Sequence, residues 1–95
     1  MSDNYEYPLL PGLSVDEITS MINFFQQVEK AYEQKAGVKK ADFELALKQF
    51  MNIVPSKMEQ KQLETKFKDE SGYDAYRVIK ALRDSKTEYI KVSDE

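Results

Sequence analysis

The chain has 95 residues, which is enough for one domain with an adequate hydrophobic core and too few for a second domain. It contains no histidine and no cysteine, so histidine-based triads, thiolate zinc sites and disulfides are excluded. The formal net charge of −3 gives the molecule no overall attraction to nucleic acid or to anionic lipid. We therefore expect a protein that is not an enzyme and that has no catalytic residues, no metal and no cofactor.

The first 13 residues predict an extended segment that clasps the helical body. Two prolines in this stretch disfavour a helix, and its tyrosines and leucines can lie on the core. A helix then begins at Ser14, which we interpret as an N-cap because Glu17, three residues later, completes a capping box. Leu13 and Ile18 occupy the flanking positions of a hydrophobic staple, which strengthens the prediction of a helix start at this point.

Apolar residues that recur every three or four positions predict helices along the rest of the chain. The expected spans are Ser14 to Gly37, Lys40 to Pro55, Ser56 to Gly72, and Asp74 to Ser85. We expect the large side chains on their apolar faces to form the core: Phe25, Tyr32, Phe43, Phe50 and Phe67. Gly72 is expected to close the third helix in a left-handed conformation.

No stretch alternates apolar and polar residues long enough to predict a sheet, so the expected class is all-α. Short connections favour antiparallel neighbours, and residues 1–95 are therefore expected to form a single helical domain. The simplest packing is a small bundle of about four helices, with the extended N-terminal segment packed on it. Residues 87–95 are mostly polar, and we expect them to fray.

The ends and the hydropathy of the chain bear on its location. The N-terminus lacks the order of basic and then apolar residues that is typical of a signal peptide. No apolar run approaches the roughly 20 residues that a membrane-spanning helix needs. We therefore expect a cytoplasmic protein that has no contact with a membrane.

Several sequence blocks, in order, resemble uncharacterised protein family 0223. They are Tyr5-Glu6-Tyr7-Pro8, Phe24-Phe25 with 28–33, Ile53-Val54-Pro55-Ser56-Lys57, and Ser71-Gly72-Tyr73 with Tyr76-Arg77. The resemblance covers most of the chain and implies a short cytosolic protein of low-GC Gram-positive bacteria, with an all-helical domain and no assigned activity. The chain departs from the family pattern at Leu13, where a tryptophan usually precedes the capping serine. Leucine can still fill the staple position.

Glu29 and Glu33 break a local rule of helix electrostatics. They lie one turn apart near the C-terminal end of the first helix, where their mutual repulsion and the helix dipole both disfavour them. One interpretation is that lysines in the following turn neutralise them. The other is that one glutamate has a tertiary partner such as Arg77, whose planar guanidinium suits a carboxylate.

Four residues are candidates for binding a partner: Lys57, Lys61, Tyr73 and Arg77. Lys57 and Lys61 lie one turn apart at the start of the third helix, where a cation opposes the helix dipole. They form either a solvated face screened by nearby glutamates or an anion site together with the free N–H groups of the helix start. If Tyr73 and Arg77 are exposed, they combine an aromatic ring with a guanidinium, a composition that interfaces favour. The sequence leaves their exposure open. Tyr76 is expected to be part of the core.

These residues lead to a function hypothesis and an alternative. The first is a small protein-protein interaction module that binds a protein partner around the turn between the third and fourth helices; homo-oligomerisation stays open. The alternative is a nucleic-acid-binding accessory domain, in which Lys57, Lys61, Lys66 and Arg77 contact phosphates and Tyr73 stacks on a base. Net acidity argues against nucleic acid. An enzyme that uses carboxylate and lysine chemistry is a third hypothesis, because sequence does not reveal small pockets.

Overall fold

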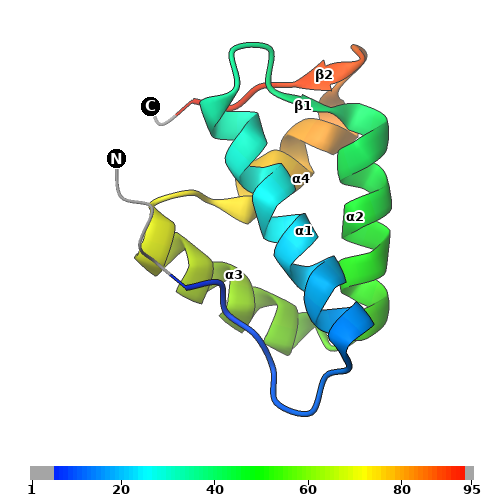
Figure 1. Cartoon of the computed structure of the whole chain (residues 1–95). Helices are drawn as coiled ribbons and strands as arrows, with labels where there is room; N and C mark the ends of the chain where they lie inside the picture. The colour runs from blue at the N-terminus through cyan, green and yellow to red at the C-terminus, as the bar shows by residue number, and fades with distance from the viewer. Residues whose placement is uncertain (1–5, 94–95) are drawn as a thin grey trace.

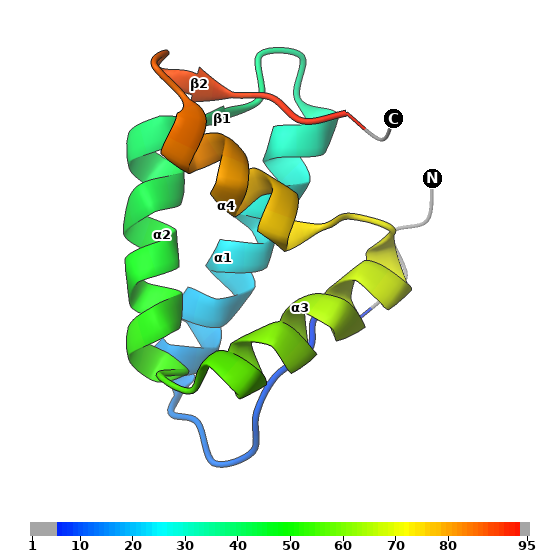
Figure 2. The ribbon, with the colours of Figure 1, turned by 180° about the vertical axis from the view of Figure 1, so that it is seen from behind.

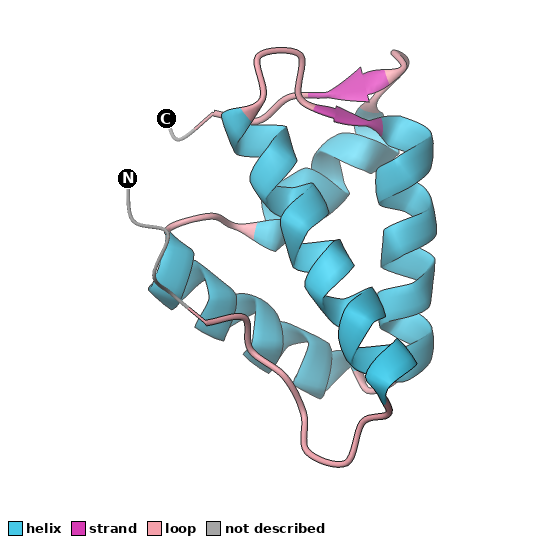
Figure 3. Ribbon diagram, in the orientation of Figure 1, coloured by secondary structure: helices cyan, strands magenta, loops and turns pink. Residues whose placement is uncertain are grey.

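The computed structural model describes residues 6–93, and within them four helices carry a two-stranded sheet at one end of the molecule (Figures 1 and 3). The helices are α1 (Val15–Glu33), α2 (Lys40–Ile53), α3 (Lys57–Ser71) and α4 (Ala75–Asp84). The strands are β1 (Val38–Lys39) and β2 (Tyr89–Ile90). The expected all-α class is confirmed, as is the small helical bundle.

No helix in this part of the chain is long and apolar enough to cross a membrane.

The two predicted serine N-caps start α1 and α3. At α1 the Ser14 Oγ accepts a hydrogen bond from the Glu17 N–H at 3.2 Å, and the Glu17 Oε1 accepts one from the Ser14 N–H at 2.9 Å. At α3 the Ser56 Oγ accepts a hydrogen bond from the Glu59 N–H at 3.3 Å. Each bond satisfies a backbone donor that the helix itself leaves unpaired. Both helix starts are therefore confirmed.

Phenylalanine rings from three helices form the centre of the core. The Phe24 ring of α1 stacks on the Phe50 ring of α2, with centroids 4.3 Å apart. The neighbouring Phe25 ring lies 4.6 Å from the Phe67 ring of α3. The four phenylalanines predicted for the core are fully buried, while Tyr32 is only half-buried. α1 lies at the middle of this packing, with α2 beside it along much of its length (Figure 1).

The expected N-terminal clasp is confirmed for residues 6–13, and its remaining part, including Tyr5, lies outside the described residues. The Tyr7 ring packs against Phe25 and Phe67, with centroids 6.2 Å from each. Pro8 is buried. The segment runs alongside α3 before it turns toward the start of α1 (Figure 1). It therefore ties α1 to α3 through one aromatic side chain.

The expectation that residues 87–95 fray is wrong for the described part of this tail. Val38 of β1 pairs with Ile90 of β2 in an antiparallel register, and the Val92 N–H donates a hydrogen bond to the Ala31 carbonyl at 3.0 Å. Ile90 and Val92 are both buried. The prediction failed because two apolar residues at alternate positions are too few to stand out in a polar stretch. The last two residues lie outside the description.

α1 ends at Glu33, before the end that was expected at Gly37. Gly37 lies in the turn before β1 with φ 87°, and a side chain there would collide with the backbone of Ile90. The glycine is thus required both by the left-handed backbone of this turn and by the close approach of β2, a distant segment. The absence of any sheet, expected from the sequence, is wrong at this one short pair of strands.

Candidate functional site

The four candidate partner-binding residues do not form one patch. Lys57 and Lys61 lie in the first half of α3, whereas Tyr73 follows its end. At 1.5 Å per residue, the helix separates its two ends by about 21 Å. Lys57, Lys61 and Arg77 are exposed, and Tyr73 is half-buried. The structure therefore divides the predicted surface into a lysine part and a part around the turn between α3 and α4.

Tyr73 is engaged in packing within the molecule. Its ring stacks on the Tyr32 ring of α1, with centroids 4.7 Å apart and an interplanar angle of 17°. Its hydroxyl donates a hydrogen bond of 2.7 Å to the Glu33 Oε2. One face of the Tyr73 ring is thus covered, and the side chain connects the end of α1 to the turn.

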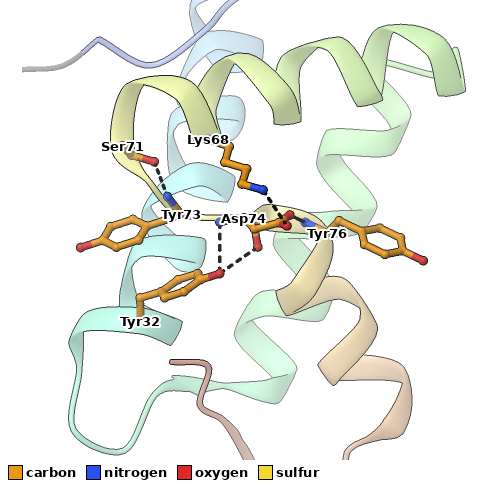
Figure 4. A network of polar contacts seen from close by, with 6 residues as sticks. All are labelled: Tyr32, Lys68, Ser71, Tyr73, Asp74 and Tyr76. Carbon is orange, nitrogen blue, oxygen red and sulfur yellow. Dashed lines mark hydrogen bonds and ion pairs between the residues drawn. The ribbon is translucent and has the colours of Figure 1, made fainter. Parts of the chain in front are cut away.

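The turn itself is held by a polar network around Asp74 (Figure 4). The Asp74 N–H donates a hydrogen bond of 3.1 Å to the Tyr32 hydroxyl, and the Asp74 Oδ1 accepts one of 2.9 Å from the Tyr76 N–H. The Lys68 Nζ forms an ion pair of 3.7 Å with the Asp74 Oδ2. Gly72 closes α3 with φ 85°, as predicted. The contacts at this turn fix the direction of α4.

Tyr76 points to the opposite side of the turn from Tyr73 (Figure 4). Its side chain is 54% exposed, so the expectation that Tyr76 belongs to the core is wrong. The neighbouring positions Ala75 and Val78 take the buried face of α4 instead. This places an aromatic ring on the surface formed by α3 and α4.

Both glutamates that break the helix rule have tertiary partners, and these include tyrosines. The Tyr7 hydroxyl donates to the Glu29 carboxylate at 2.9 and 3.0 Å, and Tyr73 donates to Glu33 as described above. Burial and the Glu29 carboxylate raise the pKa of Tyr7 to about 12. A hydroxyl donor satisfies a carboxylate without bringing a second charge to the helix end. One interpretation of the sequence predicted a tertiary partner for one of these glutamates, but the sequence gave no sign of the tyrosines.

Side chains of α2, α3 and α4 line a groove of about 330 Å³. The three helices can be followed from behind the molecule in Figure 2. The residues that line it come from one face of each helix. They are Leu47 and Met51 of α2, Lys57, Gln60, Lys61 and Glu64 of α3, and Tyr76, Ile79 and Arg83 of α4. The α3 positions follow the spacing i, i+3, i+4 and i+7, which places them on one side of that helix. We call this surface the α2–α3–α4 groove.

The α2–α3–α4 groove combines apolar side chains with a mostly cationic rim. Met51 is 42% exposed beside the exposed ring of Tyr76. Lys57, Lys61 and Arg83 supply three positive charges, and Glu64 is the only carboxylate among the lining residues. This local excess of positive charge contrasts with the net charge of −3 of the whole chain. The groove therefore favours an acidic ligand over a basic one.

Glu64 is the carboxylate of the α2–α3–α4 groove, and its pKa is raised above the ordinary value of a glutamate. Burial raises the pKa of its carboxyl, the negative charge of Asp74 raises it further, and Lys61 lowers it. Asp74 is the N-cap of α4, so the acidic side chains lie toward the turn between α3 and α4. Lys57, the first residue of α3, follows the end of α2. Along α3 the lining therefore carries its lysines at the start of the helix and Glu64 toward the turn, where Asp74 is paired with Lys68.

Two other depressions offer weaker sites. One of about 430 Å³ lies on the outer face of α3, where a single helix supplies the whole lining, including Met58 and Lys66. Another, of about 520 Å³, lies between the N-terminal clasp and α3 and includes Glu6 and Glu70. A surface walled by one helix cannot enclose a ligand from several sides, as binding sites do. Among residues 6–93, no three acidic side chains gather in a way that suits a metal ion.

The sequence pointed to Lys57 and Lys61 but not to the residues of α2 and α4 that line the α2–α3–α4 groove. Tyr76, Ile79 and Arg83 follow the spacing i, i+3 and i+7, which could have marked a shared face of the last helix. That spacing alone does not tell whether the face is buried or exposed. Met51 gave no signal, because its exposure depends on how α3 turns away from α2 after Pro55.

Comparisons with known proteins relate almost the whole chain to one family. The model of the family described as "Uncharacterised protein family (UPF0223)" matches residues 4–91. A UPF0223 protein of Streptococcus uberis is 40% identical over 92 residues, which cover 97% of this chain and 98% of the relative. A UPF0223 protein of Staphylococcus aureus is 48% identical over 83 residues, covering 87% of this chain and 86% of the relative. These relatives come from low-GC Gram-positive bacteria.

Proposed function

This chain belongs to the uncharacterised protein family UPF0223, and we propose that it acts as a small protein-interaction module. In this proposal a partner protein docks in the α2–α3–α4 groove, and the chain itself performs no catalysis. The observation that carries the proposal is that the groove combines exposed Tyr76 and Met51 with Arg83. Tyrosine, methionine and arginine are enriched at protein interfaces relative to the rest of a protein surface. We propose a cytoplasmic location on the strength of the family resemblance alone.

The docking surface proposed here differs from the one that the sequence suggested. The turn between α3 and α4 is engaged in the Asp74 network, and Tyr73 packs on Tyr32. Removing Tyr73 would therefore disturb the fold as well as any interface. The α2–α3–α4 groove, by contrast, keeps Lys57 and Lys61 and adds Tyr76 from α4. Its side chains can be changed without breaking the network at the turn.

One observation also favours the nucleic-acid alternative. Tyr76 is an exposed ring that shares the groove with three cations, and this is the composition of a site for single-stranded nucleic acid. Two features count against it: Glu64 lies within the groove and Asp74 lies close to Glu64. Repulsion between these carboxylates and a phosphate backbone would weaken binding. The test below separates the two functions.

The test places a photo-crosslinking residue either at Met51, inside the groove, or at Met58, which is 71% exposed on the outer face of α3. Each protein is irradiated in a lysate of the source cells, with and without nuclease. We expect a discrete protein adduct from position 51 that resists nuclease and disappears in the Lys57→Glu, Lys61→Glu variant. Equal adducts from both positions would refute the groove as the docking site. An adduct that nuclease removes would favour nucleic acid.

A further inference from the structure

We propose that the occupant of the α2–α3–α4 groove is a short amphipathic helix of the partner, with apolar anchors on one face and carboxylates beside them. This inference rests on the proposed function and specifies the chemistry of the partner. It is carried by three properties of the groove: the secondary structure of its walls, its length along α3, and the distribution of its charges. Each property restricts the occupant in a different way.

The walls of the groove favour a helical occupant over an added β-strand. An extended segment binds chiefly by adding its backbone to a sheet edge. The groove is walled by α2, α3 and α4, whose backbone groups are paired within the helices except at their ends. The groove therefore favours an occupant that satisfies its own backbone hydrogen bonds while it buries apolar side chains. A helix does this, and it matches the groove-binding mode of amphipathic helices.

The length of the groove fits about two helical turns. Along α3 the lining extends from Lys57 to Glu64, which corresponds to about 10 Å at 1.5 Å per residue. A partner helix would present two or three anchors at i, i+3 or i+4, and i+7 over that distance. Leu47 and Ile79 form the less exposed part of the lining, beneath the more exposed Met51 and Tyr76. Methionine is flexible and polarizable, so Met51 can adjust to anchors of different shape.

Charge determines both the sign and the direction of the occupant. Lys57, Lys61 and Arg83 favour carboxylates on the partner, while Glu64 disfavours them at the end of the groove near Asp74. The position of Lys57 adds a second reason. A cation in the first turn of α3 opposes the helix dipole, and a carboxylate from the partner would offset that unfavourable interaction. The partner's acidic residues should therefore meet the start of α3.

The test uses three lactam-constrained peptides, because unconstrained helices of this length are marginal in water. The first carries two leucines at i and i+4 with flanking glutamates. The second has lysines in place of the glutamates, and the third has serines in place of the leucines. Binding to the full chain is measured by fluorescence anisotropy, and the bound surface is mapped by ¹H–¹⁵N chemical shifts. We expect only the acidic, leucine-bearing peptide to bind and to shift Met51, Gln60 and Tyr76.

A charge-reversal pair gives the matched control. Lys57→Glu with Lys61→Glu should weaken the acidic peptide about tenfold, because attraction at two exposed pairs becomes repulsion. The same variant should improve binding of the lysine peptide. Lys30→Glu with Lys35→Glu changes the net charge equally but lies at the end of α1 and after it, outside the groove. That control should leave the acidic peptide's affinity unchanged, and thermal unfolding verifies that both variants are folded.

The outcomes separate this inference from the proposed function. No binding of the acidic peptide, equal binding of the lysine peptide, or shifts centred outside the groove would each overturn the helix proposal. If crosslinking from position 51 still captured a protein, the interaction module would survive with a different kind of occupant. If the acidic peptide bound in the groove but position 51 captured no protein, the chemistry of the groove would be right and its use in the cell would be refuted.

Discussion

Helices α1 and α3 are similar in length but are held in the fold in different ways. α1 has 19 residues and buries six of them, and it packs against the Phe50 ring of α2 and the Phe67 ring of α3. α3 has 15 residues and buries only Leu63 and Phe67. An element with few buried apolar contacts opens at a lower free-energy cost than the centre of a core. α3 should therefore be the more easily displaced helix, and it is also one wall of the α2–α3–α4 groove.

The largest expected effect tests whether α1 and α3 unfold separately. Phe50→Ala should lower the free energy of unfolding by about 3–5 kcal/mol, because it leaves a cavity against Phe24 and Phe25. Phe67→Ala should act mainly on α3. Urea unfolding gives the totals, and amide hydrogen exchange locates them: Phe67→Ala should speed exchange in α3 far more than in α1.

Met58→Ala is the matched control for these truncations, since its side chain is largely exposed on α3. It should change the free energy of unfolding by no more than about 0.5 kcal/mol. The comparison between α1 and α3 fails if Phe67→Ala speeds exchange equally in both helices. In that case α3 would be as much a part of the cooperative core as α1.

The next effect compares the glycines that follow the two helices. Gly72→Ala should cost about 1–2 kcal/mol, the strain of a left-handed backbone for a residue with a side chain, because its surroundings are open. Gly37→Ala should cost more, because its side chain would also collide with Ile90 and displace β2. Urea unfolding measures both losses. Equal losses would show that β2 yields easily and contributes little stability.

The sequence predicted those parts of the fold that depend on local signals. Ser14, Ser56 and Gly72 mark helix ends through bonds and backbone angles within a few residues, and all three predictions are confirmed. The phenylalanines of the core followed from helical spacing. Gly37 was recognised as a turn residue but assigned to the wrong element, because its true constraint is Ile90, 53 positions later. Contacts between distant segments leave no mark in local spacing.

The candidate site was predicted only in part, for the same physical reason. Lys57 and Lys61 stood out because they oppose the dipole of their own helix. Tyr76, which was expected in the core, is exposed, and Tyr73 packs on Tyr32. The direction of α4 decides which ring packs inward, and the contact between Asp74 and Tyr32 helps to set that direction. The pairing of Tyr7 with Glu29 links positions 22 apart and had no sequence signal.

The N-terminal clasp connects α1 and α3 through Tyr7, so substitutions of Tyr7 test how much the clasp stabilises the fold. Tyr7→Phe should lower the free energy of unfolding by about 1.5 kcal/mol, because a half-exposed hydrogen bond to a carboxylate is lost while the ring packing remains. Urea unfolding at neutral pH measures the change. Tyr7→Ala should cost more, since it also removes contacts with Phe25 and Phe67.

The pH dependence provides an independent measurement of the Tyr7 contact. The pKa of Tyr7 is raised from 10.0 to about 12 in the folded protein. The folded state therefore holds the proton more tightly, and its contribution is present below pH 10.0 and lost as the pH rises toward about 12. The wild type should lose more stability than Tyr7→Phe across this range. Parallel curves would contradict the clasp contact.

The smallest expected effect compares the starts of α1 and α3. Ser14→Ala and Ser56→Ala should each lower the free energy of unfolding by about 1 kcal/mol, because each leaves one backbone N–H without its side-chain acceptor. Ser14→Ala should cause the larger loss of stability. The Glu17 carboxylate also accepts a hydrogen bond from the Ser14 N–H, so the two bonds of this capping box support each other. Ser56 starts the helix with fewer buried side chains, so Ser56→Ala should, besides its smaller global loss, speed amide exchange in the first turn of α3. Urea unfolding and hydrogen exchange on both variants decide the point, with Ser93→Ala, outside the helices, as the control. A larger global loss at Ser56 than at Ser14 would mean that α3 is coupled to the core more strongly than its two buried side chains indicate.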